Sequence, residues 1–284
     1  MVISLYRVTC AMVKGTMGII GCPILEDEIV HSLSTDADEK NIYLVDTHAA
    51  QTFKKKLHAN DIPFSGIGEW DFDNYCYDLD PERFNVIVIM NRLGLHSKPE
   101  FLRRTIEEQI KFYKNRFDSV ALYYGTCGNA RWDASRWASE HRLGIPVFMM
   151  RDRNEEVCDD CIGVAVGGRS GYGDLVKRYT GKFYVTPAIA ENWDMYAKEL
   201  EFCKGFDIMN VHTVKEVFRV YGYRGAVMID TGLGIKGEDL EACCEHFVNI
   251  TGLEIITPNP CPADIYPVER IYRDAKGALR RVKV

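Results

Sequence analysis

The sequence lacks any segment long enough to span a membrane, and it lacks the complete motifs of several large protein classes. Its longest apolar runs, such as Val86–Met90, fall far short of the roughly 20 residues that a bilayer requires. Its glycine spacings match neither the P-loop nor the dinucleotide-binding fingerprint. The net charge of -6 over 284 residues leaves little basic surface for nucleic acid or anionic membrane. We therefore predict neither a nucleic-acid partner nor a membrane partner.

The N-terminus, MVISLYRVTCAMVKG, also lacks a basic region ahead of its apolar stretch. A secretory signal is therefore not expected, and we predict a cytoplasmic location. Ten cysteines are many for an ordinary globular chain of 46% apolar and 27% charged residues. In a reducing compartment such thiols serve as core residues, metal ligands or catalytic groups, and seldom as disulfides.

Short apolar runs alternate with amphipathic stretches, which is typical of a layered α/β fold. The runs that predict strands are Met17–Gly21, Asn41–Val45, Val86–Met90, Ser119–Tyr124, Pro146–Met150, Lys182–Val185, Ala226–Ile229 and Glu254–Ile256. Apolar spacing predicts a helix over 99–117, with Ser97 and Glu100 as its capping box. We predict a Rossmann-like, mostly parallel sheet with helices on both faces. Residues 1–284 would form a single domain, or two lobes at about 1–117 and 118–284.

Four chemically reactive residues each lie just past a predicted strand, at or near the start of a helix. They are Cys22, His96, Cys127 and Cys161. The carboxyl ends of parallel strands meet at one edge of the sheet, where such folds bind ligands. Three thiolates and one imidazole form a Cys₃His ligand set, which is typical of zinc. The sequence therefore predicts a metal site at this edge.

The four candidates differ in how strongly their surroundings favour this role. Cys127 is flanked by glycines in Tyr124-Gly-Thr-Cys-Gly, which allow a sharp turn that presents the thiol. Cys22 precedes Pro23 and a predicted helix, whose positive dipole end favours thiolate. Taken alone, Cys22 is better explained as a small core residue, and His96 as a surface or hydrogen-bonded histidine.

Cys161 ends the pattern Cys158-Asp-Asp-Cys161, which is half of a common structural zinc site. A redox-active pair is an alternative interpretation, but Asp159 and Asp160 would raise the thiol pKa values, whereas redox sites lower them. Cys158 is the alternative to His96 as the fourth ligand.

A glycine-rich segment, Gly167–Gly173, precedes a helix predicted at Asp174–Tyr179. Its backbone and the side chain of Arg169 could hold an anionic group of a cofactor or substrate at the helix N-terminus. We therefore predict Gly168, Arg169 and Tyr172 as cofactor-binding residues. A tight connection between two helices is the alternative, with Tyr172 facing the metal edge.

The motifs around the candidate ligands resemble those of an uncharacterised family of archaeal and bacterial proteins, known only as a domain of unknown function. These motifs are IIGCPILEDE at 19–28, LHSKPE at 95–100, YGTCG at 124–128, DCI at 160–162 and GKFYVTP at 181–187. The resemblance implies a place beside corrinoid-dependent methyltransferase systems of methanogens and other anaerobes. It also implies the same four ligands, and a corrinoid protein or methyltransferase as partner.

Three functions remain open from the residues and the resemblance together. The first is a zinc-dependent methyltransferase or accessory, in which the metal holds a substrate thiol as thiolate. The second is an iron–sulfur protein for electron transfer or corrinoid reactivation, with the same ligands or with Cys158 in place of His96. The third is a non-catalytic binding or chaperone partner of a methyltransferase. Whether the protein is an enzyme stays open.

Overall fold

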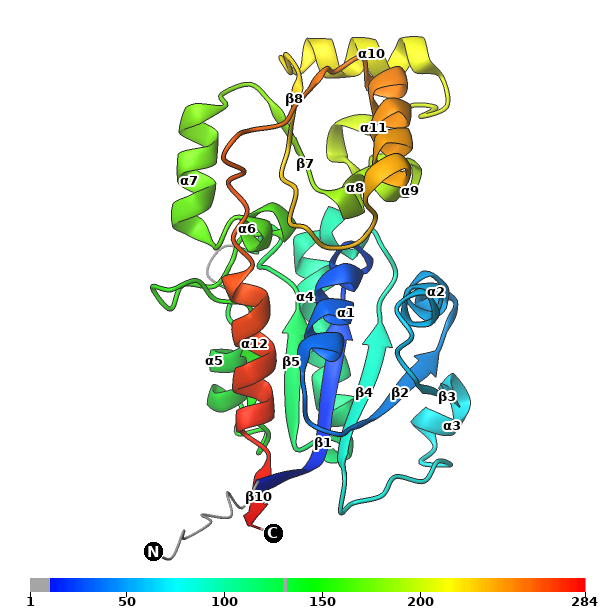
Figure 1. Cartoon of the computed structure of the whole chain (residues 1–284), viewed down its shortest axis with the longest axis vertical. Coiled ribbons are helices and arrows are strands. Elements are labelled where there is room, and N and C mark those ends of the chain that lie inside the picture. Colours follow the sequence, from blue (N-terminus) through cyan, green and yellow to red (C-terminus); the bar gives the residue numbers. More distant parts are fainter. Residues whose placement is uncertain (1–10, 130–131, 284) are drawn as a thin grey trace, which may run out of the picture.

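The computed structural model describes residues 11–129 and 132–283, and its larger sheet forms one half of the molecule (Figure 1). Six parallel strands make up this sheet in the order β3-β2-β4-β1-β5-β6. They are β1 (Ala11–Gly21), β2 (Asn41–Asp46), β3 (Ser65–Gly68), β4 (Phe84–Met90), β5 (Ser119–Tyr123) and β6 (Val147–Met149). A further strand, β10 (Arg280–Lys283), pairs antiparallel with the start of β1.

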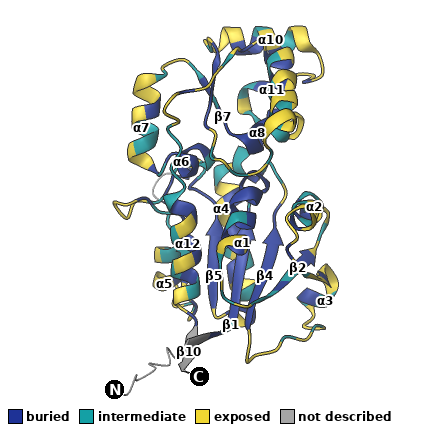
Figure 2. Cartoon of the chain, viewed as in Figure 1, coloured by how far each residue is buried: buried dark blue, intermediate teal, exposed yellow. Residues whose placement is uncertain are grey.

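Helices cover both faces of this sheet, which is why its central strands are almost entirely apolar. The helices α1 (Glu26–Thr35), α2 (Gln51–Ala59) and α12 (Tyr266–Gly277) pack into the core on one face. The helices α3 (Glu69–Asp73), α4 (Pro99–Tyr113) and α5 (Ala134–Glu140) pack into the core on the other. Every residue of β4 is buried, as Figure 2 shows. A strand enclosed on both faces cannot alternate polar and apolar residues.

A second, three-stranded parallel sheet forms the other half of the molecule around a separate core. Its strands are β7 (Phe183–Val185), β8 (Ala226–Met228) and β9 (Ile255–Ile256). The helices of this half are α6 (Cys161–Ala165), α7 (Arg169–Arg178), α8 (Pro187–Glu191), α9 (Trp193–Glu199), α10 (Val211–Val220) and α11 (Gly237–Thr251). We call residues 11–160 and 264–283 the large lobe and residues 161–263 the small lobe.

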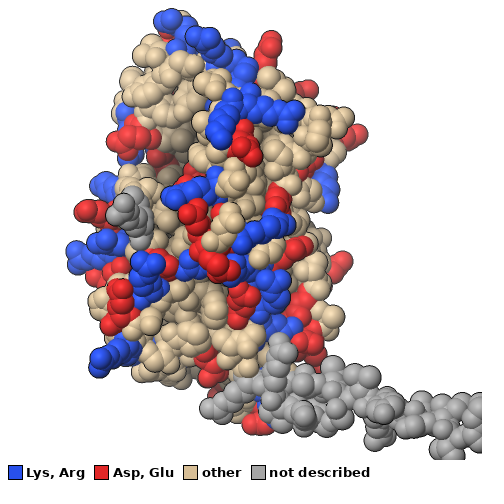
Figure 3. Space-filling model, turned by 90° about the vertical axis from the view of Figure 1, so that its left-hand side faces the viewer, with Lys and Arg blue, Asp and Glu red and all other residues tan. Residues whose placement is uncertain are grey.

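The chain crosses between the lobes twice, and the two crossing segments lie side by side. The backbone N–H of Asp264 donates to the carbonyl of Ala165 at 2.8 Å, and Val166 and Asp264 form an isolated parallel bridge. On the face drawn in Figure 3, acidic and basic side chains are interspersed over the large lobe. None of the described helices is long and apolar enough to cross a membrane.

The predicted fold class is confirmed: the protein is α/β, with a mostly parallel sheet and helices on both faces. All eight predicted strands are present, whereas β3 and β10 were not predicted because their short sequences, SGIG and RRVK, carry no apolar run. The organisation expected from the sequence, a single domain or two lobes at about 1–117 and 118–284, stays a prediction.

Two predicted details of the helices are wrong. The capping box does not form, because the Ser97 hydroxyl donates to the Gly94 carbonyl at 2.8 Å and no side chain caps α4. The glycine-rich segment is also not a loop up to residue 173, because α7 begins at Arg169. Gly171 lies inside this helix, where a Cβ would stand 1.9 Å from the carbonyl oxygen of Val166. Close packing against α6 therefore requires that glycine.

Candidate metal centre

The order of the strands creates a crevice at the carboxyl ends of β1, β4 and β5. The connection that leaves β1 runs through α1 on one face of the sheet, whereas those leaving β4 and β5 run through α4 and α5 on the other. The loops on either side of β1 therefore diverge, and a crevice of this kind is where open α/β sheets bind ligands. Cys22 directly follows β1, His96 lies in a short turn after β4, and Cys127 follows β5.

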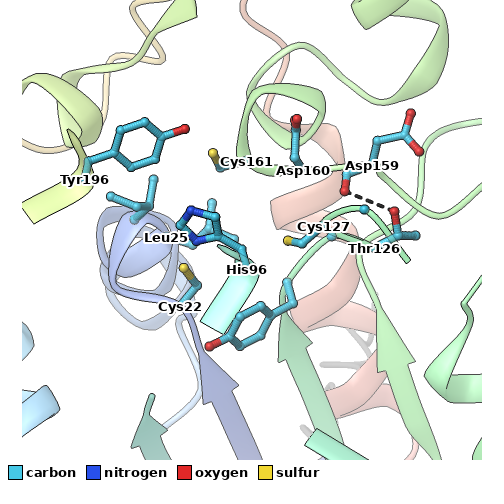
Figure 4. A pocket seen from close by; sticks show the side chains of 13 residues that line it. Cys22, Leu25, His96, Thr126, Cys127, Asp159, Asp160, Cys161 and Tyr196 are labelled. Carbon is cyan, nitrogen blue, oxygen red and sulfur yellow. Dashed lines mark hydrogen bonds between the residues drawn. The ribbon is translucent and has the colours of Figure 1, made fainter. Parts of the chain in front are cut away.

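A cavity of about 360 Å³ opens at this crevice, and all four predicted ligands line it. In Figure 4 the sulfur atoms of Cys22, Cys127 and Cys161 point into the same space as the ring of His96. The full set of lining residues is Cys22, Ile24, Leu25, His96, Tyr124, Gly125, Thr126, Cys127, Gly128, Asp159, Asp160, Cys161 and Tyr196. The tertiary structure thus brings together four residues that are up to 139 positions apart (161 − 22) in the sequence.

Backbone contacts fix the loop that carries Cys127 against the segment that leads to Cys161. The N–H of Cys127 donates to the carbonyl of Asp159 at 2.6 Å, and the N–H of Thr126 donates to the carbonyl of Cys158 at 2.9 Å. A Cβ on Gly125 would stand 2.7 Å from the backbone of Asp159, so only glycine permits this approach. Cys127 itself adopts a left-handed conformation, with φ of 47°. The loop therefore holds this thiol at a fixed place in the cavity wall.

The donor chemistry fits a soft transition metal, but the spacing does not fit a single ion in this conformation. Thiolate and imidazole are ligands that zinc and iron–sulfur clusters share. Among the described residues, however, no three Cys, His, Asp or Glu side chains stand close enough to bind one ion. One zinc ion needs all of its sulfur ligands at about 2.3 Å. In a [4Fe–4S] cluster each protein ligand binds a different iron, so such a cluster accepts more widely spaced donors.

Burial keeps the donors of this cavity in their neutral forms. Burial first, and then the neighbouring Glu26 and Glu28, together raise the pKa of Cys22 to about 12. The pKa values of Cys127 and Cys161 are also raised, first by burial and then by nearby acidic groups, including Asp160. Burial lowers the pKa of His96, an effect that nearby Lys204 supports and Glu199 opposes. A bound metal would instead favour the charged form of the three thiols, because it stabilises thiolate and releases protons.

Among the lining residues that were not predicted as site residues, Tyr196 and Asp160 have polar side chains with a defined place in the wall. Tyr196 comes from α9 in the small lobe, and its ring stacks on His96 with centroids 5.9 Å apart. Its hydroxyl has no hydrogen-bond partner in the part of the chain that the structure describes. Asp160 caps α6, where its Oδ1 accepts from the N–H of Gly163 at 2.8 Å. The sequence offered a signal for Asp160, because this residue lies between Cys158 and Cys161. It offered none for Tyr196, which reaches the cavity only because the small lobe contacts the large lobe.

Cys158 lies apart from this cavity. It is buried in the core of the large lobe, where burial raises the pKa of its thiol to about 12. Its backbone N–H donates to the carbonyl of Met150 at 3.0 Å, which holds the segment beside β6. Its role as a replacement for His96 stays a prediction.

The three predicted cofactor-binding residues lie beside the cavity and not on its wall. Gly168 precedes α7 with φ of 105°, and Tyr172 packs against Tyr184 with ring centroids 6.2 Å apart. Arg169 is 62% exposed and lies 3.6 Å from a carboxylate oxygen of Glu156 and 3.8 Å from one of Asp159. Asp159 does line the cavity, so Arg169 stands near its rim. A role for these residues in holding a cofactor stays a prediction.

Comparison with known proteins places the chain in one family. No curated protein and no solved structure matches it. A family model described as "Protein of unknown function (DUF1638)" matches residues 90–260. The matched segment includes His96, Cys127, Cys158 and Cys161, and it leaves Cys22 outside. The resemblance to an uncharacterised family is thereby confirmed, and the chain belongs to the DUF1638 family.

Proposed function

We propose that this protein is a metalloprotein whose metal centre occupies the cavity between the lobes. Cys22, Cys127 and Cys161 would be its thiolate ligands, and His96 would be the fourth ligand. The single observation that carries the proposal is that these four residues, from four separate segments of the chain, line one cavity at the strand-order switch. An accidental gathering of core cysteines has no reason to occur at the edge where this fold class binds ligands.

The chain's own residues prepare this cavity in two ways. Apolar side chains, including Ile24 and Leu25, form part of its wall and limit the access of water. The neutral imidazole of His96 has a lone pair free for a metal, because its lowered pKa disfavours the protonated form. When bound, a thiolate-held zinc would activate a substrate thiol, and a cluster would supply or accept an electron.

The spacing of the donors favours an iron–sulfur cluster over a single zinc ion. No three donor side chains of the described residues reach one ion as they stand, whereas a cluster distributes its cysteines over several irons. A mononuclear zinc centre would need the side chains to move together. Zinc remains the second candidate, because the Cys₃His donor set is common in zinc proteins.

We further propose that the centre serves corrinoid-dependent methyl transfer and one-carbon metabolism. The support is the resemblance that the motifs around the ligands carry, which implies this metabolic context. A corrinoid protein or a methyltransferase would be the partner, either as the recipient of the chemistry or as the client of a non-catalytic chaperone. A cytoplasmic location suits this role, because the free thiols of the site require reducing conditions.

The test is elemental analysis, with an absorption spectrum, of protein purified without oxygen. We expect iron and sulfide in stoichiometric amounts, with broad visible absorption. Stoichiometric zinc in a colourless protein would instead select the second candidate. Cys127→Ser should lose most of the bound metal. Cys243→Ser is the matched control, because Cys243 packs on the small-lobe core outside the cavity.

Two results would overturn the proposal of a metal centre. One is wild-type protein without metal after anaerobic reconstitution with iron and sulfide or with zinc. The other is a Cys127→Ser variant with unchanged metal content. Metal-free protein that co-purifies with a methyltransferase would support the non-catalytic role instead.

A further inference from the structure

The cavity lies between two lobes, and each lobe supplies part of its wall. Cys22, His96 and Cys127 belong to the large lobe. Cys161 and Tyr196 belong to the small lobe, and the ring of Tyr196 stacks on that of His96. In Figure 4 Tyr196 and Cys161 lie on one side of the cavity, and Cys22 and Cys127 lie on the other. A rotation of the small lobe away from the large lobe would therefore widen the cavity.

The two segments that connect the lobes have the features of a hinge. They lie side by side, because the N–H of Asp264 donates to the carbonyl of Ala165 at 2.8 Å. The first segment continues into Gly167 and Gly168, with φ of 77° and 105°. Glycines absorb changes of backbone angle that other residues resist, and two adjacent crossings share one axis. This geometry permits rotation of the small lobe about the crossings.

The apolar contact between the lobes is small in comparison with the core of each lobe. In the part of the chain that the structure describes, two buried apolar side chains join the core of the opposite lobe, Ile24 and Val164. Val164 lies next to the first crossing, where a rotation moves it least. Ile24 is therefore the main buried apolar side chain that opening would expose. An interface of this size allows relative motion of two lobes that each keep their own core.

An ion pair holds the lobes together away from the crossings. The Nζ of Lys56, on α2, lies 2.7 Å from Oε2 of Glu191, at the end of α8. Lys56 also lies 2.7 Å from Oδ1 of Asp27, so its charge stays paired within the large lobe even without Glu191. The other charged contacts between the described parts of the lobes are longer. They are those of Arg169, at 3.6 and 3.8 Å, and a hydrogen bond of Lys204 at 3.3 Å.

The closed arrangement also has a cost, which opening would relieve. Oδ2 of Asp27 is buried and has no hydrogen-bond partner among the described residues. A Cβ on Gly234 of the small lobe would stand 2.4 Å from this oxygen, so the small lobe covers it. A buried acceptor without a partner is destabilising, and opening would return it to water. The closed state is thus held by one ion pair and opposed by one desolvated oxygen, a balance that keeps opening accessible.

We propose that the small lobe is a hinged cover of the cavity, and that the ion pair of Lys56 with Glu191 is the latch that keeps this cover closed. The small lobe would turn about the crossings at 166–168 and 263–264 and carry Tyr196 away from His96. Opening would admit a ligand to the cavity, and closure would exclude water from it. The inference goes beyond the proposed metal centre and holds whether or not the cavity binds metal.

The test measures how fast the cavity thiols react with fluorescein maleimide in metal-free protein without oxygen, at one pH. This reagent is too bulky for a closed cavity of about 360 Å³. Mass spectrometry identifies each labelled cysteine. Glu191→Ala removes the latch and leaves Lys56 paired with Asp27. We expect Cys22, Cys127 and Cys161 to react about tenfold faster in this variant, because the open population rises when the ion pair is lost.

Two buried cysteines and one variant serve as controls. Cys158 lies in the core of the large lobe and Cys203 in that of the small lobe, so their labelling reports unfolding of either core. Both should stay protected in Glu191→Ala. Glu216→Ala is the matched variant, because it removes a carboxylate that lies 2.7 Å from Arg219 within α10 of the small lobe. It should leave every labelling rate unchanged.

Two results would overturn the inference. Equal labelling of the cavity thiols in Glu191→Ala and Glu216→Ala would show that the ion pair is no latch. Labelling of Cys158 or Cys203 in parallel with the cavity thiols would show unfolding in place of a lobe rotation. Because the protein is free of metal throughout, failure of the latch leaves the metal centre untouched. Absence of metal binding likewise leaves the labelling result unchanged.

Discussion

Two buried polar clusters lie where the small lobe meets the start of α1, and they differ in how their charges are balanced. The first is the cavity of thiols, Asp159, Asp160 and aromatic rings. The second, which we call the lysine cluster, consists of Lys56, Glu26, Asp27 and Glu191. Its Lys56 Nζ lies 2.7 Å from Asp27 Oδ1 and 2.7 Å from Glu191 Oε2. Glu191 ends α8 in the small lobe, whereas Lys56 lies on α2 in the large lobe.

The difference separates a structural contact from a ligand site. In the lysine cluster the chain supplies its own cation, and Thr52 also donates to Glu26 at 2.6 Å. The described wall of the cavity holds no lysine or arginine; its thiols are neutral, and Asp159 lies 3.8 Å from Arg169 outside the wall. Buried charge must be paired, so the lysine cluster can hold the lobes together without any ligand. The thiols of the cavity become charged only when a metal enters, because the metal stabilises thiolate.

The largest expected effect comes from removing the cation of the lysine cluster. Lys56→Met leaves buried carboxylates without their partner, and it should lower the free energy of unfolding by about 3–5 kcal/mol. Lys54→Met, on the same helix, is the control. Its exposed pair with Asp46 should contribute less than about 1 kcal/mol. Urea unfolding of both variants measures the difference. Equal losses would remove the distinction between a structural cluster and a surface pair.

A smaller effect is expected at Glu28, which lies one residue past Asp27 and has a buried oxygen without a partner. Burial first, and then the nearby charge of Asp27, together raise the pKa of Glu28 from its ordinary 4.5 to about 8. Because the folded-state pKa is the higher one, the protonated form favours folding. Its contribution is complete below the unfolded pKa and is lost as pH rises through about 8.

Glu28→Gln should therefore be more stable than the wild type at neutral pH, by roughly 3 kcal/mol, and nearly equal to it at about pH 4.5. Urea unfolding of metal-free protein across this pH range measures the difference between the two proteins. A constant difference over the whole range would show that this carboxyl is not buried as a neutral acid.

Metal binding at the cavity should raise the free energy of unfolding, as the ion pairs of Lys56 do in the lysine cluster. For reversible binding of zinc at a free concentration of one hundred times the dissociation constant, the gain is about 2.7 kcal/mol. Thermal unfolding without oxygen, with and without a chelator, measures this gain. It should vanish in Cys127→Ser, whose metal-free stability should stay close to that of the wild type. A gain of equal size in that variant would place the metal elsewhere.

The smallest expected effect is at Tyr196, whose hydroxyl has no partner among the described residues. Tyr196→Phe should change the free energy of unfolding by less than about 0.5 kcal/mol. Tyr123→Phe is the contrast, because the buried hydroxyl of Tyr123 donates to Ser32 Oγ at 2.7 Å. Its removal should cost about 1 kcal/mol. Similar losses in denaturant unfolding would mean that the Tyr196 hydroxyl serves the fold and not a ligand.

Much of the fold was predictable because its signals are local. The run FNVIVIM can be satisfied only by a strand with both faces covered, and β4 is such a strand. The apolar spacing of Leu102, Ile106 and Ile110 likewise corresponds to the buried face of α4. The capping of α4 was not predictable with the same success, because its N-cap is Lys98 and Ser97 lies one residue too early to accept from the first turn. The Ser97 hydroxyl donates to the Gly94 carbonyl instead. Backbone geometry decides at which residue a helix begins, and residue type does not reveal it.

The sequence by itself determined the succession of strands and helices, and it placed Cys22, His96 and Cys127 just after strands. It did so because apolar periodicity and turn residues act over short distances along the chain. Only the tertiary structure decided that β1 lies between β4 and β5, which gathers these residues around one cavity. It also decided that Tyr196 reaches the cavity and that Lys56 meets Glu191. Strand order and lobe contacts depend on residues far apart in sequence. The entropy lost in bringing such residues together is offset only when the whole core packs.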